Sequence, residues 1–202
     1  ESLAIISVHQ TWCVAKPSSS ISSLTDNIEY SCSYYMDNED CNEIKEGNPC
    51  FNPNSILHHA SFAMNAYYQK QGRHYWNCDF KNSGLITITN PSNCDHSCCI
   101  YNGGDTFVDF DLSGKWCVAK STASDEMLQA NIDWACNQVD CSLIKAGGNC
   151  FEPNTLLNHA SVAMNIYYQK IGKVDLSCDF NGTGLVVIKD PSYDTCKYQH
   201  LN

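Results

Sequence analysis

The sequence predicts an α+β fold, built as two tandem small disulfide-rich domains that each pack two or three helices on a small antiparallel sheet. Three observations lead to this prediction. The segment Cys50–Lys70 returns as Cys150–Lys170 with few changes, so the chain contains an internal repeat. Each copy combines a helical pattern of apolar residues with a short β-branched run. Fourteen of the 202 residues are cysteine, a density typical of extracellular domains too small to be stabilised by an apolar core alone.

The repeat sets the expected domain boundaries, because shared motifs recur in the same order. Trp12–Lys16, for example, returns as Trp116–Lys120. We therefore expect a first domain over residues 1–101 and a second over residues 112–202. Residues 102–111 read NGGDTFVDFD, and their glycines and acidic residues suit a short linker.

The first helix of each domain is indicated by apolar residues at every fourth position, which share one side of a helix. The residues concerned are Leu24, Ile28 and Cys32 in the first domain, with Leu128, Ile132 and Cys136 in the second. Serines at 18–20 and Ser124 precede these segments, and their hydroxyls are good N-caps. The sequence thus predicts one capped amphipathic helix near the start of each domain.

A second helix and a strand are expected in the rest of each domain. The helix follows Pro53 or Pro153 and is entered through Asn54 or Asn154, and its core face collects small and apolar residues. In the first domain that face is Leu57, Ala60, Ala63, Met64 and Tyr67, and Gly72 is placed to end the helix. The segments Leu85–Thr89 and Leu185–Lys189 are rich in β-branched residues and predict short strands.

The composition excludes several classes of function. The net charge is −10, whereas a nucleic-acid binder is normally basic, and an anionic membrane surface is disfavoured for the same reason. No stretch approaches the roughly 20 apolar residues of a membrane span, so we expect no membrane insertion. An even number of cysteines indicates an oxidising, extracellular compartment. A neutral partner such as a sugar polymer fits this charge best.

The repeated motifs resemble the X8 domain, also called carbohydrate-binding module family 43. The second copy carries WCVA at 116, IDWAC at 132, DCSLI at 140, HASVAMNIYYQ at 159, CDF at 178 and DPSYDTC at 190. The first copy departs from this pattern with IEYSC, DCNEI and NPS. The resemblance implies a non-catalytic, secreted plant protein of the cell wall or apoplast, which binds β-1,3-glucan of the callose or laminarin type through tandem modules.

The resemblance also implies a pairing for the cysteines, which spacing alone leaves open among 15 connectivities per module. The implied bridges are Cys13–Cys78, Cys32–Cys99, Cys41–Cys50, Cys117–Cys178, Cys136–Cys196 and Cys141–Cys150. Cys94–Cys98 would then be an extra local bridge, and Cys98 and Cys99 could exchange roles. A metal cluster of Cys94, His96, Cys98 and Cys99 is the alternative, but a secreted chain favours disulfides, so we expect no metal and no cofactor.

Sugar recognition needs aromatic faces together with amides and hydroxyls. Helical spacing places a polar stripe beside the core face of the second helix, formed by Ser61, Asn65, Tyr68 and Gln69, with Ser161, Asn165, Tyr168 and Gln169 in the second copy. Packing on the strands is the alternative role for this stripe. Tyr30 and its counterpart Trp134 follow an acidic residue on the first helix and are further candidates, as is Trp76, which has no aromatic counterpart.

Two other functional questions arise from the sequence. Asn181-Gly182-Thr183 is a sequon in a predicted turn, so Asn181 is a candidate for glycosylation. A glycosidase needs two carboxylates across a cleft, but the acids shared by both copies all adjoin cysteines, so we expect no catalysis. The alternatives are a defence or storage protein on the same scaffold without useful sugar affinity, and a processed fragment of a larger β-1,3-glucanase.

Overall fold

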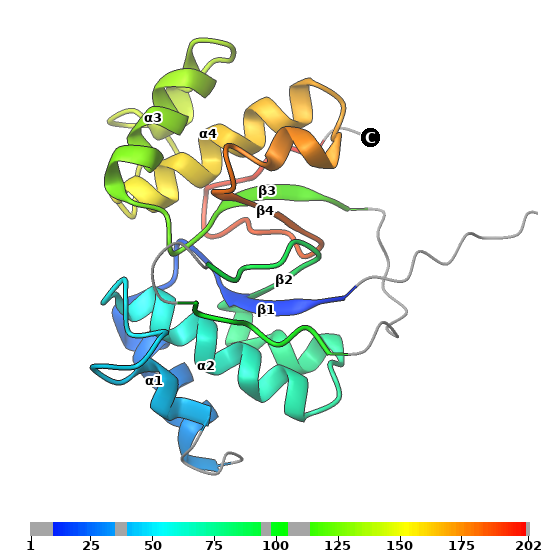
Figure 1. The fold of residues 1–202 in the computed structure, drawn as a ribbon. Coiled ribbons are helices and arrows are strands. Elements are labelled where there is room, and N and C mark those ends of the chain that lie inside the picture. Colours follow the sequence, from blue (N-terminus) through cyan, green and yellow to red (C-terminus); the bar gives the residue numbers. More distant parts are fainter. Residues whose placement is uncertain (1–9, 35–39, 94–97, 105–113, 201–202) are drawn as a thin grey trace, which may run out of the picture.

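The structure of the chain, a computed structural model, describes residues 10–34, 40–93, 98–104 and 114–200. These residues form an α+β fold of two similar halves, which confirms the predicted fold class (Figure 1). Most of the predicted linker, residues 105–111, lies outside the described residues.

Each half contains two strands, two α-helices and short 3-10 helices. The first half comprises β1 (Trp12–Ala15), α1 (Ile21–Tyr34), η1 (Asp40–Ile44), α2 (Ile56–Lys70), η2 (Tyr75–Cys78), η3 (Phe80–Asn82) and β2 (Gly84–Thr87). The second comprises β3 (Trp116–Ala119), α3 (Asp125–Cys136), η4 (Ser142–Ile144), α4 (Leu156–Lys170), η5 (Asp175–Cys178) and β4 (Gly184–Val187). The α-helices and β2 and β4 lie where the sequence predicts them.

The strands of the two halves join into one antiparallel sheet with the order β1-β2-β4-β3. Within each half, β1 pairs with β2 and β3 pairs with β4. Between the halves, β2 meets β4 at Thr87 and Val187. The Ile88 N–H donates to the Val186 carbonyl at 3.0 Å, and the Ile188 N–H donates to the Ile86 carbonyl at 2.9 Å. Backbone pairing therefore fixes the two halves against each other.

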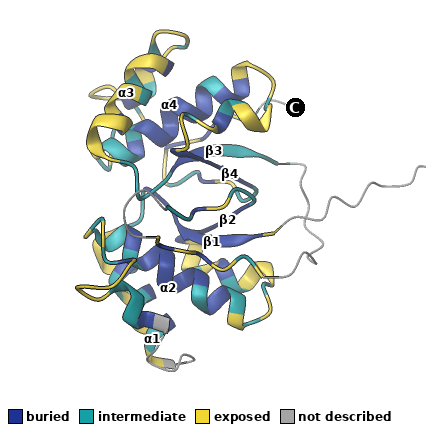
Figure 2. Ribbon diagram, in the orientation of Figure 1, coloured by how far each residue is buried: buried dark blue, intermediate teal, exposed yellow. Residues whose placement is uncertain are grey.

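Helices lie beyond both outer strands of this sheet. Figure 1 shows α1 and α2 beside β1, and α3 and α4 beside β3, and the faces turned inward are buried in Figure 2. The core continues across the sheet, because Val14 and Leu85 of the first half pack in one cluster with Val118 and Leu185 of the second. Within the described residues, no helix combines the length and apolar character needed to cross a bilayer.

Two local predictions need correction. The N-caps of α2 and α4 are Ser55 and Thr155, not Asn54 and Asn154: the two hydroxyls accept from the N–H groups three residues later. The caps of α1 and α3 agree with the prediction, since Ser20 Oγ and Ser124 Oγ accept from Ser23 and Met127. Strands β1 and β3 were not predicted at all, because four residues with a central cysteine are too short for a clear alternating pattern.

The disulfides confirm two implied bridges and contradict four. Cys13–Cys78 and Cys117–Cys178 are present. The other pairs in the structure are Cys32–Cys41, Cys50–Cys99, Cys136–Cys141 and Cys150–Cys196. The implied bridges that are therefore wrong are Cys32–Cys99, Cys41–Cys50, Cys136–Cys196 and Cys141–Cys150.

The local geometry explains these pairings. The cysteine at the end of the first helix and the next cysteine along the chain have Cα atoms 5.9 Å apart in the first half and 5.4 Å apart in the second, well within the range for a disulfide. Cys98 is also disulfide-bonded, whereas Cys94, its predicted partner, lies outside the described residues, as does His96. Because Cys98 and Cys99 are both in disulfides, the alternative metal cluster lacks two of its thiolates.

Candidate functional site

Each half carries an open groove between its first helix and the 3-10 segments that precede its second strand. Groove 1 encloses about 680 Å³ and is lined by residues of α1, α2, η2 and η3. Groove 2 encloses about 610 Å³ and is lined by the equivalent residues of α3, α4 and η5 and the turn after it. The same hollow therefore forms twice, at equivalent positions.

Three aromatic rings form the wall of groove 1. Tyr30 comes from α1, Tyr67 from α2 and Phe80 from η3, and their ring centroids lie 5.3–6.3 Å apart in edge-to-face contacts. The Tyr30 and Tyr67 hydroxyls are 3.3 Å apart. Tyr67 is buried, but Tyr30 keeps 45% of its surface exposed, so one aromatic face is open to the groove.

Groove 2 repeats this wall with a larger exposed ring. Trp134, Tyr167 and Phe180 make edge-to-face contacts with centroid distances of 4.5–5.9 Å. Trp134 stands where groove 1 has Tyr30, and 47% of its surface is exposed. The structure thus places two of the predicted sugar-binding residues, Tyr30 and Trp134, in the two equivalent grooves.

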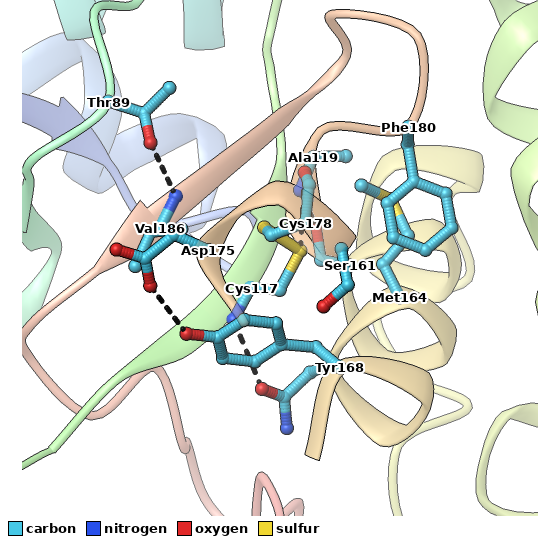
Figure 3. Close-up of a disulfide and its surroundings, with 12 residues drawn as sticks. Thr89, Cys117, Ala119, Ser161, Met164, Tyr168, Asp175, Cys178, Phe180 and Val186 are labelled. Atoms are coloured by element: carbon cyan, nitrogen blue, oxygen red, sulfur yellow. Dashed lines mark hydrogen bonds between the residues drawn. A yellow bond between two sulfur atoms is a disulfide. The ribbon is translucent and has the colours of Figure 1, made fainter. Parts of the chain in front are cut away.

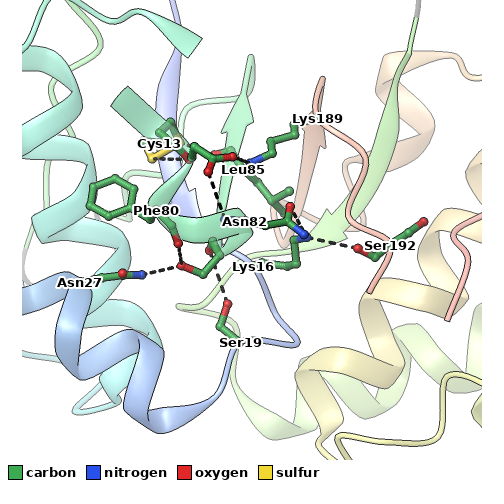
Figure 4. Close-up of polar contacts among 12 residues, drawn as sticks. Cys13, Lys16, Ser19, Asn27, Phe80, Asn82, Leu85, Lys189 and Ser192 are labelled. Carbon is green, nitrogen blue, oxygen red and sulfur yellow. Dashed lines mark hydrogen bonds and ion pairs between the residues drawn. A yellow bond between two sulfur atoms is a disulfide. The ribbon is translucent and has the colours of Figure 1, made fainter. Parts of the chain in front are cut away.

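A left-handed turn holds each phenylalanine in its aromatic wall. Phe80 has a φ of 42° and Phe180 a φ of 43°, a conformation that costs energy for a residue with a Cβ. In the first half, Asn27 Nδ2 donates to Ser83 Oγ at 2.8 Å, and Ser83 Oγ donates to the Phe80 carbonyl at 2.5 Å (Figure 4).

The same chain of bonds recurs in the second half. Asn131 Nδ2 donates to Thr183 Oγ1 at 2.8 Å, and Thr183 Oγ1 donates to the Phe180 carbonyl at 2.6 Å. The first helix of each half therefore fixes the turn that presents the ring, and strain of this kind is typical of functional sites.

The polar rims of the grooves differ in charge. Groove 1 has three lining carboxylates, Asp26, Glu29 and Asp79, whereas groove 2 has Asp179 alone among its described lining residues. The Lys189 ammonium of the second half bonds Asp79 at 2.9 Å (Figure 4) and lowers the pKa of that carboxyl. A residue of one half therefore helps to set the charge of the groove in the other.

Trp76 widens the aromatic surface of groove 1. Its ring is 57% exposed and stacks on His74 with a centroid distance of 4.4 Å. Leu176 stands at the equivalent place in groove 2 and is also exposed. Trp76 therefore lies in the groove, as expected for a sugar-binding candidate, and distinguishes groove 1 from groove 2.

The polar stripe on α2 and α4 does not reach a groove. In the first half, Asn65 Oδ1 accepts from the Cys13 N–H at 3.1 Å, Ser61 Oγ accepts from the Ala15 N–H at 3.0 Å, and Gln69 Nε2 donates to the Thr11 carbonyl at 2.8 Å. These bonds satisfy two outward-facing N–H groups of β1 and the carbonyl of the residue before it.

The second half repeats these contacts. Asn165 bonds Cys117 (Figure 3), Ser161 bonds Ala119 and Gln169 bonds Lys115. Tyr68 and Tyr168 are fully buried, and the Tyr168 hydroxyl bonds Asp175 at 3.2 Å. We therefore correct the sugar-binding assignment of Ser61, Asn65, Tyr68, Gln69, Ser161, Asn165, Tyr168 and Gln169. The alternative, structural role fits them because the serines and amides bond backbone groups of the fold and the two tyrosines are buried.

Several groove residues were not predicted as a site. Phe80 and Phe180 belong to the repeated CDF motif, and that repetition after a cysteine was the available signal. Tyr67 and Tyr167 were expected to be core residues, but each also lines its groove. Asn181, the sequon asparagine, lines groove 2 beside Phe180.

The grooves are favoured over other hollows by their aromatic content. Two further hollows border α2 and α4 near Lys70 and Lys170. Their described linings expose no aromatic ring, because the ring they do contain, Phe62, is buried. Within the described residues, no group of three or more His, Cys, Asp or Glu is placed to hold a metal ion.

The grooves are suited chemically to a neutral polyhydroxylated ligand. An exposed aromatic face contacts the C–H patches of a pyranose ring, and the neighbouring amides and carboxylates bond its hydroxyls. Groove 1 supplies Asn77 and Asp79 for this purpose, and groove 2 supplies Asp179.

Comparison with known protein families gives one match. The X8 domain matches residues 11–85 and 115–185, which contain both aromatic walls. No solved structure shows a significant match to the chain.

Similar sequences occur in plant proteins. A segment of 85 residues is 59% identical to a glucan endo-1,3-beta-glucosidase of Triticum aestivum and covers 42% of this chain but 18% of that protein. The major pollen allergen Ole e 10 of Olea europaea is 51% identical over 86 residues, covering 42% of this chain and 70% of the allergen. Glucan endo-1,3-beta-glucosidase 12 of Arabidopsis thaliana is 46% identical over 123 residues, covering 58% and 22% respectively. The glucosidases thus share only a small part of their length with the chain.

Proposed function

This chain belongs to the X8 domain family, a family of carbohydrate-binding modules, and from that premise we propose that it is a secreted plant protein that binds β-1,3-glucan without hydrolysing it. The observation that carries the proposal is the duplicated aromatic groove, in which Tyr30 and Trp134 each present an exposed ring beside polar groups. Glucan of the callose or laminarin type would lie along these rings.

The net charge of the chain and the names of similar plant proteins both support β-1,3-glucan as the ligand. A neutral glucan suffers no repulsion from a chain with a net charge of −10. Two of the similar plant proteins are named for the hydrolysis of glucan 1,3-β linkages, so the same linkage is the first to test here. Two grooves on one chain gain affinity for a repeating polymer, because binding at one raises the effective concentration at the other.

Two observations support a non-catalytic role. Among the described lining residues, only one carboxylate position, Asp79 or Asp179, is common to both grooves, whereas glycoside hydrolysis uses a pair of carboxyl groups. The matched part of the wheat glucosidase is 18% of its length, so the similarity gives no support for its activity here. Incubation with laminarin should release no reducing ends.

The test is calorimetric titration of the full chain, produced in bacteria under conditions that form disulfides, with a β-1,3-linked glucose hexasaccharide. We expect two binding equivalents. Tyr30→Ala and Trp134→Ala should each weaken one equivalent by about tenfold, and the double variant should weaken both. Met127→Ala is the control, because Met127 is an exposed residue of α3 that does not line groove 2.

Two outcomes would contradict the proposal. Unchanged binding by the double variant would place the ligand elsewhere on the molecule. Complete absence of affinity in the unmodified sequence would favour the alternative of a defence or storage protein on the same scaffold. Equal affinity for a β-1,4-linked hexasaccharide would remove the linkage preference but keep carbohydrate binding.

A further inference from the structure

Groove 2 contains a potential modification site that groove 1 lacks. Asn181 is exposed and lines groove 2 together with Trp134 and Phe180. It begins the sequence Asn181-Gly182-Thr183, the acceptor pattern for N-glycosylation. Its φ of 55° lies in the left-handed region, which asparagine tolerates better than most residues.

The counterpart in groove 1 cannot carry the same modification. Lys81 occupies the equivalent position on the rim, and the following residues are Asn82 and Ser83. Asn82 is followed by Ser83 and then glycine, which is not an acceptor pattern. The two grooves therefore share an aromatic wall but differ at the residue beside it.

We propose that Asn181 is N-glycosylated and that its glycan covers the aromatic wall of groove 2, so that the secreted protein presents groove 1 as its open site. A glycan is bulky and hydrophilic, and here it would start from a residue that lines the groove itself. The statement about glucan binding rests on the proposed function, but the statement about coverage does not.

The modification is a group transfer with a defined donor. A polyprenyl-pyrophosphate-linked oligosaccharide, the donor of the secretory pathway, supplies the sugar. A bond forms between Asn181 Nδ2 and the anomeric carbon, and the bond from that carbon to the pyrophosphate oxygen breaks. The amide nitrogen loses one proton, and the polyprenyl pyrophosphate leaves with the electron pair of the broken bond. No oxidant or reductant takes part.

A glycan over groove 2 would change the number of grooves that one chain offers to a glucan. With both grooves open, one chain could bind a glucan twice and gain from effective concentration. With groove 2 covered, the second half would act through its contacts with the first, such as the Lys189–Asp79 bond at the rim of groove 1. Glycosylation at one residue would thus set the valency of the protein.

The first experiment measures modification and coverage without any ligand. The chain is secreted from eukaryotic cells in a Trp76→Leu background, which copies Leu176 and leaves Trp134 as the exposed groove tryptophan. Intact mass should show an N-glycan that Asn181→Gln removes. Acrylamide should quench the fluorescence of the glycosylated chain less than that of the Asn181→Gln chain. Equal quenching of the two chains, or no glycan on the first, would overturn the proposal.

The second experiment measures the consequence for binding, with Trp76 retained. Titration with a β-1,3-linked hexasaccharide should give one equivalent for the glycosylated chain and two for the same chain produced in bacteria, which carries no glycan. Two equivalents on a chain whose mass confirms the glycan would overturn the covering role. No binding by either chain would instead reject the proposed function, and the quenching result would still decide whether groove 2 is covered.

Discussion

At the scale of single residues, the exposed ring of each groove decides how strongly the ligand is held. Trp134 and Tyr30 make the same edge-to-face contacts with their neighbours, so the larger indole offers more contact area on an equivalent support. Aromatic contacts are worth about 0.5–1.5 kcal/mol beyond their buried area. We therefore expect groove 2, without a glycan, to bind more tightly than groove 1 unless Trp76 compensates.

Trp134→Ala should weaken binding at groove 2 by about tenfold, which corresponds to about 1.4 kcal/mol. The reason is the loss of the exposed ring, since the remaining rings of the wall, Tyr167 and Phe180, are only partly exposed. Calorimetry on the bacterial chain measures the change, and Met127→Ala serves as the matched substitution on the same helix. A Trp134→Ala chain that keeps both equivalents at full affinity would show that the ring is not a contact.

His58 is a second residue with a measurable consequence. It is fully buried at the start of α2, where its Nδ1 lies 3.2 Å from the Tyr101 hydroxyl. Burial lowers the pKa of His58 from 6.5 to about 4. Between these two pH values the unfolded chain therefore binds a proton more readily than the folded chain does. The contribution of neutral His58 to the free energy of unfolding is fully present above pH 6.5 and is lost as the pH falls towards 4.

The loss attributable to His58 should be about 3 kcal/mol between pH 7 and pH 4. Denaturant unfolding at a series of pH values measures it. His58→Asn is the informative variant, because the second half has Asn158 at this position, where it donates to the Tyr193 hydroxyl at 2.7 Å. If the variant loses stability with acid as steeply as the original chain, another group is responsible.

Sequence reasoning at this scale selected isolated aromatic residues that line the grooves, but it also selected the polar stripe, which does not. Tyr30 and Trp134 could be placed because each follows an acidic residue on a first helix, and Trp76 stood out because it has no aromatic counterpart. Asn65 and Ser61 share a helix face, which periodicity reveals, but periodicity does not say that this face meets the backbone of β1. That contact depends on a strand that the sequence did not reveal.

At the scale of elements, α2 and α4 complete the hydrogen bonding of the outer strands. Asn165 Oδ1 accepts from the Cys117 N–H at 3.1 Å, and Asn165 Nδ2 donates to the Gln199 carbonyl at 2.9 Å. The first contact is buried, so its loss leaves a buried backbone N–H without a partner. The helix and strand are therefore held together by polar contacts, and a buried disulfide ties the same strand to Cys178 of η5.

Asn165→Leu should therefore lower the free energy of unfolding by about 1–3 kcal/mol. The cost comes from the unpaired Cys117 N–H, because leucine is similar in size and stays buried. Chemical denaturation measures it. Asn154→Leu is the control, since Asn154 is exposed and a surface substitution changes stability by about 0.5 kcal/mol or less. Equal effects of the two would contradict the role assigned to Asn165.

The disulfide pairing could not be predicted from the sequence because it depends on where short secondary-structure elements lie. The cysteines at the ends of α1 and α3 pair with the next cysteine along the chain, at sequence separations of 9 and 5. The resemblance gave a different pairing, and spacing alone allowed many. Cys41 lies in η1 and Cys141 lies at the start of η4, and such short 3-10 segments have no periodic signal in the sequence.

At the scale of the whole molecule, the two halves form one body. They share the sheet, and Lys16 of the first half donates to the Ser192 carbonyl of the second at 3.2 Å (Figure 4). Ile188 packs on the core of the first half, and Ile88 packs on the core of the second. The repeat predicted two halves correctly, but nothing in a repeated sequence shows which strands will meet between the copies.

We expect the chain to unfold in a single cooperative transition. Ile188→Pro should separate it into two, because proline removes the N–H that donates to the Ile86 carbonyl across the β2–β4 junction. Differential scanning calorimetry measures this through the ratio of calorimetric to van't Hoff enthalpy. Ile188→Val keeps the N–H and should keep one transition. Two transitions in the original chain would show that the halves are independent.

The side chains that satisfy the outward backbone groups of β1 and β3 have a further consequence. An unpaired edge strand can pair with a strand of another molecule, which leads to fibres or domain-swapped dimers. Here one edge strand of each two-stranded unit is covered by the second helix of its own half, and the other strand pairs with the equivalent strand of the other half. Because each unit has one free strand edge, two units can pair but a third cannot join their sheet. A third copy in the same chain would therefore have to fold as a separate domain.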